Sequence, residues 1–174
     1  MVYYEDQQIL IRDLRLEDAQ VITDGEIAQG WHATVDKYLS RLQDRDAGKC
    51  ISLVAEFEGH VAGYINVYPD VRTGPFGDMG WPEIVDFGVL EKYRRHGVGG
   101  KLMDTAERIA GEYADTVFLG VGLHSGYGSA QRMYVKRGYI PDGSGVWYCG
   151  KVCQEYAPCA NDDDLTLFLS KKLR

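Results

Sequence analysis

The stretch that decides the fold runs from Val89 to Leu102 and reads V-L-E-K-Y-R-R-H-G-V-G-G-K-L. It stands between an apolar strand pattern at 83–89 and a helical pattern that begins near Gly99. Glycines have no Cβ, so this turn can adopt positive φ angles and bring its amides close to a ligand. The first amides of a helix lack intrahelical acceptors, and together with the helix dipole and two arginines they attract anions. The stretch therefore predicts a turn that holds a diphosphate.

Spacing excludes two familiar phosphate-binding turns. A Walker loop requires Ser or Thr after its lysine, whereas Leu102 follows Lys101. A dinucleotide fingerprint requires its glycines directly after a strand and an acidic residue about 20 positions further on. Here a charged stretch intervenes, and the next expected strand has no acid at its end. A nicotinamide cofactor is therefore not expected, and the remaining alternative is a glycine-rich connection without a ligand.

A second motif lies downstream of the first. Residues 129–139 read S-A-Q-R-M-Y-V-K-R-G-Y, a short helical pattern that Gly138 ends and an aromatic residue follows. Together the two segments resemble the GNAT superfamily of acetyl-CoA-dependent N-acetyltransferases, whose motifs are Arg/Gln-x-x-Gly-x-Gly/Ala and Ala-x-x-x-Tyr-x-x-x-Gly-Phe/Tyr. The resemblance extends from about Ile9 to Leu173, and it is specific within 83–139.

This resemblance implies a fold and an activity. The expected fold class is α/β, a GNAT-like mixed, mostly antiparallel sheet with flanking helices and a parallel central strand pair that opens for the cofactor. Residues 1–174 are expected to form a single domain. The implied function is an N-acetyltransferase, in which a primary amine of a small molecule or peptide directly attacks acetyl-CoA, the co-substrate. The alternative is a non-catalytic module that binds acetyl-CoA and senses its level.

The resemblance also implies where acetyl-CoA binds. The backbone N–H of Phe87 would lie near the thioester carbonyl, and the main chain of Val89 along the pantetheine arm. Many relatives bind that arm with an Asn where this chain has Tyr127, so the 122–129 loop is expected to be remodelled. The residues expected to hold the pyrophosphate, largely through backbone amides, are Arg94, Arg95, His96, Gly97, Val98, Gly99, Gly100 and Lys101.

Tyr134 is the predicted general acid. It stands four residues after Ala130 and four before Gly138, which is the position of the acid tyrosine in the family. Its hydroxyl would protonate the leaving thiolate of CoA or donate a hydrogen bond to it. The alternative is a tyrosine that only packs in the core.

Three residues compete for the role of general base. By resemblance, Glu83 occupies the position that serves as base in several members, often through water, although it could be an ordinary acid at a strand end. Asp86 is a rival, but strand alternation places Glu83 and Asp86 on opposite faces, so at most one of them is the base. His124, just after the expected strand at 116–123, is the third candidate.

Composition agrees with a single-core enzyme. The chain has 174 residues, of which 45% are hydrophobic, and carries a formal net charge of −7. The acidic balance argues against a nucleic-acid partner and mildly favours a cationic acceptor. No apolar run is long enough to cross a membrane, and the start does not resemble a signal peptide, so we expect a cytoplasmic monomer or homodimer. The four cysteines fit no common zinc spacing; free thiols and no metal are expected.

Periodicity predicts the order of the remaining elements. Strands are expected at 8–14, 51–57, 61–68, 83–89, 116–123, near 139 and at 165–170, with helices at 16–29 and from a Thr34 cap to 45. The helix after the turn should bury Leu102, Ala106, Ile109, Ala110 and Tyr113. A loop is expected at 69–82. Residues 142–164 are expected to be an insertion, with 162–164 as a solvated acidic turn.

Overall fold

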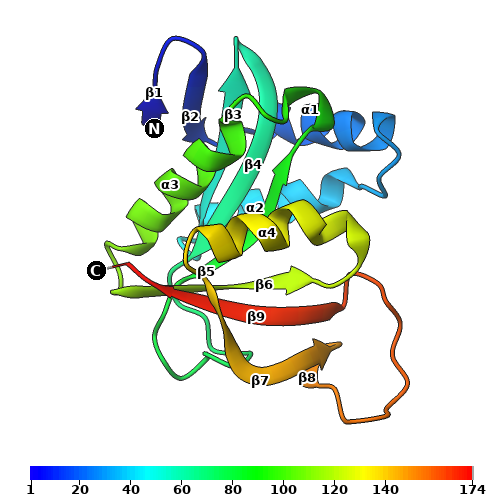
Figure 1. Cartoon of the computed structure of the whole chain (residues 1–174). Coiled ribbons are helices and arrows are strands. Elements are labelled where there is room, and N and C mark those ends of the chain that lie inside the picture. Colours follow the sequence, from blue (N-terminus) through cyan, green and yellow to red (C-terminus); the bar gives the residue numbers. More distant parts are fainter. Residues whose placement is uncertain (174) are drawn as a thin grey trace. The chain divides into compact units, whose positions relative to one another are not determined.

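The computed structural model describes residues 1–173 and divides into two compact units (Figure 1). The first unit comprises residues 1–68 and 84–109, and the second comprises residues 69–83 and the chain after residue 109. None of the helices within residues 1–173 is long and apolar enough to cross a membrane. Each unit has its own strands and helices, and the predicted site residues are distributed between them.

The first unit is built on five neighbouring strands. Their order is β1 (Val2–Glu5), β2 (Ile9–Asp13), β3 (Ile51–Phe57), β4 (His60–Tyr68) and β5 (Glu83–Val89). The pairs from β1 to β4 are antiparallel. Glu58 and Gly59, with φ of 50° and 80°, reverse the chain between β3 and β4, which form a hairpin. After β5, a short 3₁₀ helix, η1 (Glu91–Tyr93), leads to the glycine-rich turn.

Helices cover both faces of this sheet (Figure 1). On one face, α1 (Leu16–Ala28) and α2 (Val35–Asp46) pack around a buried cluster that includes Ile22, Tyr38, Val54 and Tyr64. On the other face lies α3 (Val98–Ala110), whose Leu102 side chain approaches Gly63 of β4. A Cβ added to Gly63 would lie 2.6 Å from the Gly88 carbonyl oxygen of β5 and 3.2 Å from Leu102 Cδ1, so glycine is needed for this close packing.

A carboxylate is buried inside the first unit. Glu26 of α1 is 3% exposed and accepts hydrogen bonds from the hydroxyls of Tyr38, at 2.6 Å, and Tyr64, at 2.5 Å. The Lys37 ammonium lies 3.3 Å from the Tyr64 oxygen and above both tyrosine rings. A buried carboxylate is tolerated only when it is hydrogen-bonded or paired, and the two tyrosine hydroxyls satisfy Glu26. This polar cluster therefore joins α1, α2 and β4.

The second unit contains four antiparallel strands. Their order is β6 (Thr116–Gly122), β9 (Leu165–Lys172), β7 (Ile140–Tyr148) and β8 (Lys151–Val152). A 3₁₀ helix, η2 (Ser125–Tyr127), and α4 (Gly128–Lys136) follow β6, and α4 lies over the strands of this unit in Figure 1. The 69–82 loop is anchored by Phe76, whose ring packs against those of Trp81 and Phe118.

Most elements agree with the sequence predictions, and three differ. Tyr113 is 55% exposed because α3 ends at Ala110, so it does not belong to the buried face. The predicted insertion at 142–164 contains most of β7 and all of β8, and β1 was not predicted. Gly143 and Gly145 obscured β7 because they have φ near 86° within an irregularity between Pro141 and Val146, where regular alternation fails.

The buried tyrosines should make stability fall in alkaline solution. Burial, reinforced by Glu26, raises the pKa of Tyr38 and Tyr64 above the ordinary value. The folded chain therefore keeps protons that the unfolded chain releases above about pH 10, and the free energy of unfolding should be unaffected by these groups below that pH and decrease above it. Each tyrosine should contribute up to about 1.4 kcal/mol per pH unit. Urea unfolding from about pH 9 to 11.5 measures this slope.

Two variants check the assignment of this alkaline slope. Tyr38→Phe should flatten it, because one titrating group is removed. Tyr156→Phe should leave it unchanged, because Tyr156 is 96% exposed and has nearly the same surroundings in the folded and unfolded chains. Equal slopes in all three proteins would contradict the explanation.

Candidate functional site

The glycine-rich turn has the backbone of an anion-binding nest. Arg95 and Gly97 have φ of 67° and 84°, and α3 begins at Val98. The Lys101 N–H is the first to bond back into the turn, donating to the Gly97 carbonyl over 3.1 Å. Residues with positive φ before a helix start direct successive N–H groups into one concavity. The amides from Gly97 to Gly100 thus follow left-handed residues at a helix start, and phosphate binding there stays a prediction.

Two glycines of the turn have different surroundings. A Cβ at Gly99 would lie 3.2 Å from the Phe87 ring and 3.4 Å from Val89 Cγ2, so Gly99 allows α3 to pack closely on β5. A Cβ at Gly100 would have no heavy atom within 4 Å. The start of α3 is therefore packed against β5 at Gly99 and open at Gly100.

Arg94 is directed toward the protein. Its guanidinium lies over the Trp31 ring, with Cζ 5.4 Å from the ring centroid. It donates to the Val89 carbonyl over 3.2 Å and pairs with Glu91 over 3.3 Å. These contacts hold the turn against β5 and η1, so the Arg94 side chain has a packing role in addition to its predicted contact with the pyrophosphate.

Two more basic side chains of the turn also contact the first unit. The His96 ring lies 4.8 Å from the Phe57 ring, and Lys101 Nζ lies 4.4 Å from the Tyr4 ring. A hydrogen bond from the Lys101 ammonium to the Tyr4 hydroxyl oxygen raises the pKa of Lys101, which stays a cation. Arg95 is exposed and has no ion pair within residues 1–173. Main-chain amides and Arg95 are therefore the groups of this turn best placed to meet a free anion.

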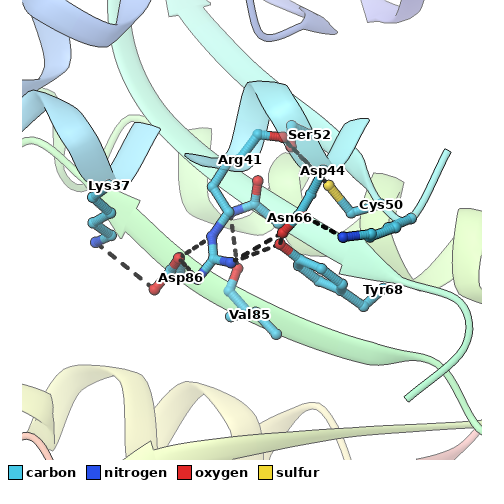
Figure 2. Close-up of polar contacts among 10 residues, drawn as sticks. Lys37, Arg41, Asp44, Cys50, Ser52, Asn66, Tyr68, Val85 and Asp86 are labelled. Atoms are coloured by element: carbon cyan, nitrogen blue, oxygen red, sulfur yellow. Dashed lines mark hydrogen bonds and ion pairs between the residues drawn. The ribbon is translucent and has the colours of Figure 1, made fainter. Parts of the chain in front are cut away.

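Asp86 is engaged by two cations from α2 (Figure 2). Its Oδ2 atom lies 2.7 Å from both Nε and Nη2 of Arg41, and its Oδ1 atom lies 3.8 Å from Lys37 Nζ. Asp86 thus faces α2, whereas the neighbouring Phe87 faces α3. The strand places these two residues on opposite faces, as alternation predicts.

Glu83 is the first residue of β5 and is half-buried. The residue before it, Pro82, accepts a hydrogen bond from the Phe118 N–H of β6 over 3.0 Å. This bond fixes the chain immediately before Glu83 within the second unit. The position of Glu83 is therefore set by backbone contacts on β6.

Tyr134 lies on α4 and is 5% exposed. Its ring is 5.7 Å from that of Tyr139, the aromatic residue that follows Gly138 in the second motif. Burial, and to a smaller extent the neighbouring Tyr127, raises the pKa of Tyr134 above its ordinary value. The hydroxyl therefore remains protonated at neutral pH and is able to donate.

His124, Tyr127 and Asp163 form a polar cluster in the second unit. The Tyr127 hydroxyl donates to Asp163 Oδ1 over 2.9 Å, and His124 Nε2 lies 3.0 Å from the same oxygen. His124 Nδ1 accepts the Gly126 N–H over 3.1 Å, so the proton is on Nε2 in the neutral ring. Both ring nitrogens are thus occupied. The acidic run at 162–164 is exposed, as predicted, but Asp163 also anchors it to η2.

The predicted residues divide between the units. Phe87, Val89 and the turn belong to the first unit, and Glu83, Tyr127 and Tyr134 belong to the second. Sequence reasoning missed Arg41, the partner of Asp86, and Asp163, the partner of His124. No local sequence pattern identified either residue as a partner, because Arg41 is 45 positions from Asp86 and Asp163 is 39 positions from His124.

Comparison with solved structures identifies the fold. Ard1 from Thermoplasma volcanium has a TM-score of 0.68 and 21% identity, covering 96% of this chain and 99% of its own. The ribosomal-protein-alanine N-acetyltransferase from Brucella melitensis has a TM-score of 0.67 and 21% identity, covering 94% and 99%. The protein yncA from Salmonella typhimurium, solved with its cofactor acetyl-CoA, has a TM-score of 0.67 and 19% identity, covering 97% and 95%.

These similarities confirm the predicted fold class, a mixed α/β fold with a mostly antiparallel sheet, one parallel strand pair and flanking helices. No curated protein matches the sequence. The model of the acetyltransferase (GNAT) family matches residues 13–139, which include both motifs and most of the chain. This family uses acetyl-CoA as its acetyl donor. The chain therefore belongs to the GNAT family of acetyltransferases.

Proposed function

We propose that this acetyltransferase transfers the acetyl group of acetyl-CoA to a primary amine of a small molecule or peptide by direct attack. The observation that carries the proposal is the turn from Arg94 to Lys101. Its backbone provides a nest at a helix start, with open space beside Gly100. Such a nest suits the diphosphate of CoA because backbone N–H groups and the helix dipole both favour anions.

The attacking amine must lose a proton. A free lysine-like amine has a pKa of about 10.4 and is mostly charged at pH 7, so a base is needed. Asp86 is already paired with Arg41 and Lys37, and both nitrogens of His124 are engaged. Either residue would have to break these contacts before accepting a proton. The position of Glu83 at the start of β5, which the family resemblance links to the base, supports Glu83 in this role, acting directly or through water.

The leaving thiolate needs a hydrogen-bond donor. Tyr134 stands at the acid position of the second motif, and its raised pKa keeps the hydroxyl protonated. A thiol has an ordinary pKa of about 8.5, so a thiolate is too weak a base to remove this proton completely. We therefore assign Tyr134 to stabilising the developing thiolate by a hydrogen bond, with full proton transfer completed by solvent.

The acceptor is proposed only as a class. Some similar structures are N-acetyltransferases of ribosomal proteins, and the net charge of −7 is compatible with a cationic acceptor. A thiol-release assay with acetyl-CoA and a panel of polyamines, aminoglycosides, amino acids and lysine peptides tests the proposal. We expect release of the CoA thiol that depends on one amine of the panel. Mass spectrometry should then detect the acetylated form of that amine. Cofactor binding without release for any amine would contradict it.

The first prediction concerns the nest. Gly97→Val should weaken CoA binding at least about tenfold, because a β-branched residue resists the left-handed conformation by about 1–2 kcal/mol or more. Calorimetric titration with CoA measures the change. Gly48→Val is the matched control: Gly48 also has a positive φ, 71°, and lies just after α2, outside the glycine-rich turn, so this variant should preserve affinity. Wild-type affinity in Gly97→Val would show that the diphosphate binds elsewhere.

The second prediction ranks the bases. Glu83→Gln should lower kcat mainly on the acid side of the pH profile, because the amine then lacks an acceptor for its proton, and CoA affinity should persist. His124→Ala should have a smaller effect on kcat because its nitrogens are already bonded within η2 and to Asp163. Steady-state kinetics from about pH 6 to 9 compare the variants. A larger loss in His124→Ala would transfer the role to His124.

The third prediction removes one hydroxyl. Tyr134→Phe keeps the ring, so packing and CoA affinity should change little, while kcat should fall about 10²-fold because the thiolate loses a donor. Pre-steady-state acetyl transfer measures the chemical step, and thermal unfolding checks the fold. Tyr139→Phe is the control, a second buried tyrosine of the same motif. A loss in Tyr134→Phe below about threefold would mean that Tyr134 only packs.

A further inference from the structure

Asp86 has an unusual backbone for a residue within a strand. Its φ is 53°, which lies in the left-handed region, although Asp86 is the fourth of the seven residues of β5. Residues with a Cβ avoid this region, and aspartate tolerates it better than most. Such a conformation persists only where the surroundings determine it. The contacts of Asp86 show which groups do so.

Arg41 holds the side chain of Asp86. Two guanidinium nitrogens contact one carboxylate oxygen at 2.7 Å, and the third, Nη1, donates to the Tyr68 hydroxyl over 2.6 Å. Tyr68 in turn donates to Asp44 over 2.8 Å. Because Arg41 and Asp44 lie on α2 and Tyr68 ends β4, the guanidinium is fixed from both sides (Figure 2).

Asn66 holds the peptide group before Asp86. Its side-chain Nδ2 donates to the Val85 carbonyl over 3.3 Å, and Asn66 is 3% exposed (Figure 2). The N–Cα bond of Asp86, about which φ is measured, therefore has an anchored peptide group on one side. On the other side the Asp86 carboxylate is anchored by Arg41. Rotation about that bond would break at least one of these contacts.

This rotation decides the direction of the next amide. A change of φ at Asp86 from left-handed to an ordinary strand value turns the peptide group that contains the Phe87 N–H. The family resemblance places this N–H near the thioester carbonyl of acetyl-CoA, whose oxygen it would stabilise in the proposed reaction. We infer that Arg41 and Asn66 are positioning residues, which hold Asp86 in its left-handed conformation and so orient the Phe87 N–H. The inference rests on the proposed function. Asp86 then contributes to the reaction through its backbone conformation and transfers no proton.

Two substitutions of Asp86 separate conformation from charge. Asp86→Gly and Asp86→Ala both remove the carboxylate, but glycine adopts positive φ freely and alanine does not. We expect Asp86→Gly to keep kcat within about threefold of the wild type, and Asp86→Ala to lose at least about tenfold, since misplacing one oxyanion donor costs up to 10²–10³-fold. The KM for acetyl-CoA should stay within about twofold in both, because the diphosphate nest is separate.

Arg41→Met tests the partner in two backgrounds. It should lower kcat at least about tenfold in the wild type but less than about twofold when added to Asp86→Gly, because glycine needs no side-chain anchor. Arg45→Met is the matched control: it makes the same change on the same helix, where Arg45 pairs with Asp46 and donates to the Leu14 carbonyl. It should keep wild-type kcat whatever its melting temperature.

Three outcomes would overturn the inference. Equal losses in Asp86→Gly and Asp86→Ala would show that the carboxylate itself is needed. Equal effects of Arg41→Met in both backgrounds would show that Arg41 acts by another route. An unchanged kcat in Asp86→Ala would show that the conformation is irrelevant.

A binding-independent measurement separates this inference from the proposed function. The amide NMR shifts of Phe87 should move in Arg41→Met and match the wild type in Arg45→Met, whether or not any amine is acetylated. If the wild type acetylates no amine, the function fails while these shifts still test the positioning. If the shifts of Phe87 are the same in all three proteins, the positioning fails regardless of activity.

Discussion

The ion pair between Arg41 and Asp86 is the contact on which the arrangement of the first unit around β5 depends. It joins α2 to the middle of β5, and its charges are only partly exposed, with side-chain exposures of 25% and 22%. Removing one partner of such a pair leaves the other charge poorly solvated, so the two residues constrain each other. Burial opposes the charge of Arg41, but Asp86 outweighs this and raises its pKa, so the guanidinium stays protonated.

In the turn after β5, the side chains and the main chain have different roles. Arg94, His96 and Lys101 pack against aromatic rings of the first unit, which fixes the path of the chain. The backbone amides are then left to recognise an anion. Main-chain donors held in this way lose little conformational freedom on binding, which favours affinity for the ligand. The side chains that sequence reasoning would assign to phosphate thus also maintain the shape of the nest.

A polar network continues from this region into the core. Lys37 contacts both Asp86 and Tyr64, and Tyr64 donates to the buried carboxylate of Glu26. Each polar group in this series has a partner of opposite charge or a hydrogen bond. Buried polar networks that are fully satisfied favour one packing arrangement, because an alternative arrangement leaves groups unpaired. Helices α1 and α2 are consequently held in register with the strand that carries Phe87.

The sequence by itself determined the elements whose causes are local. Glycines at 97 and 138 mark a turn and a helix end because only glycine readily takes positive φ there, and the apolar pattern at 83–89 predicted β5 with its correct bounds. The two motifs identified the family, which the match over residues 13–139 confirms. Most of strand β7 was not predicted, because its own glycines interrupt the alternation of side chains along the strand.

Tertiary structure alone decided which polar groups meet. Arg41 and Asp86 are 45 residues apart, as His124 and Asp163 are 39 apart, and charge carries no information about its partner until packing brings the two together. The left-handed conformation of Asp86 has the same origin, since aspartate has no strong local reason to adopt it within a strand. Neighbouring residues determine local backbone preference, whereas backbone strain and long-range pairing arise only when the whole unit packs.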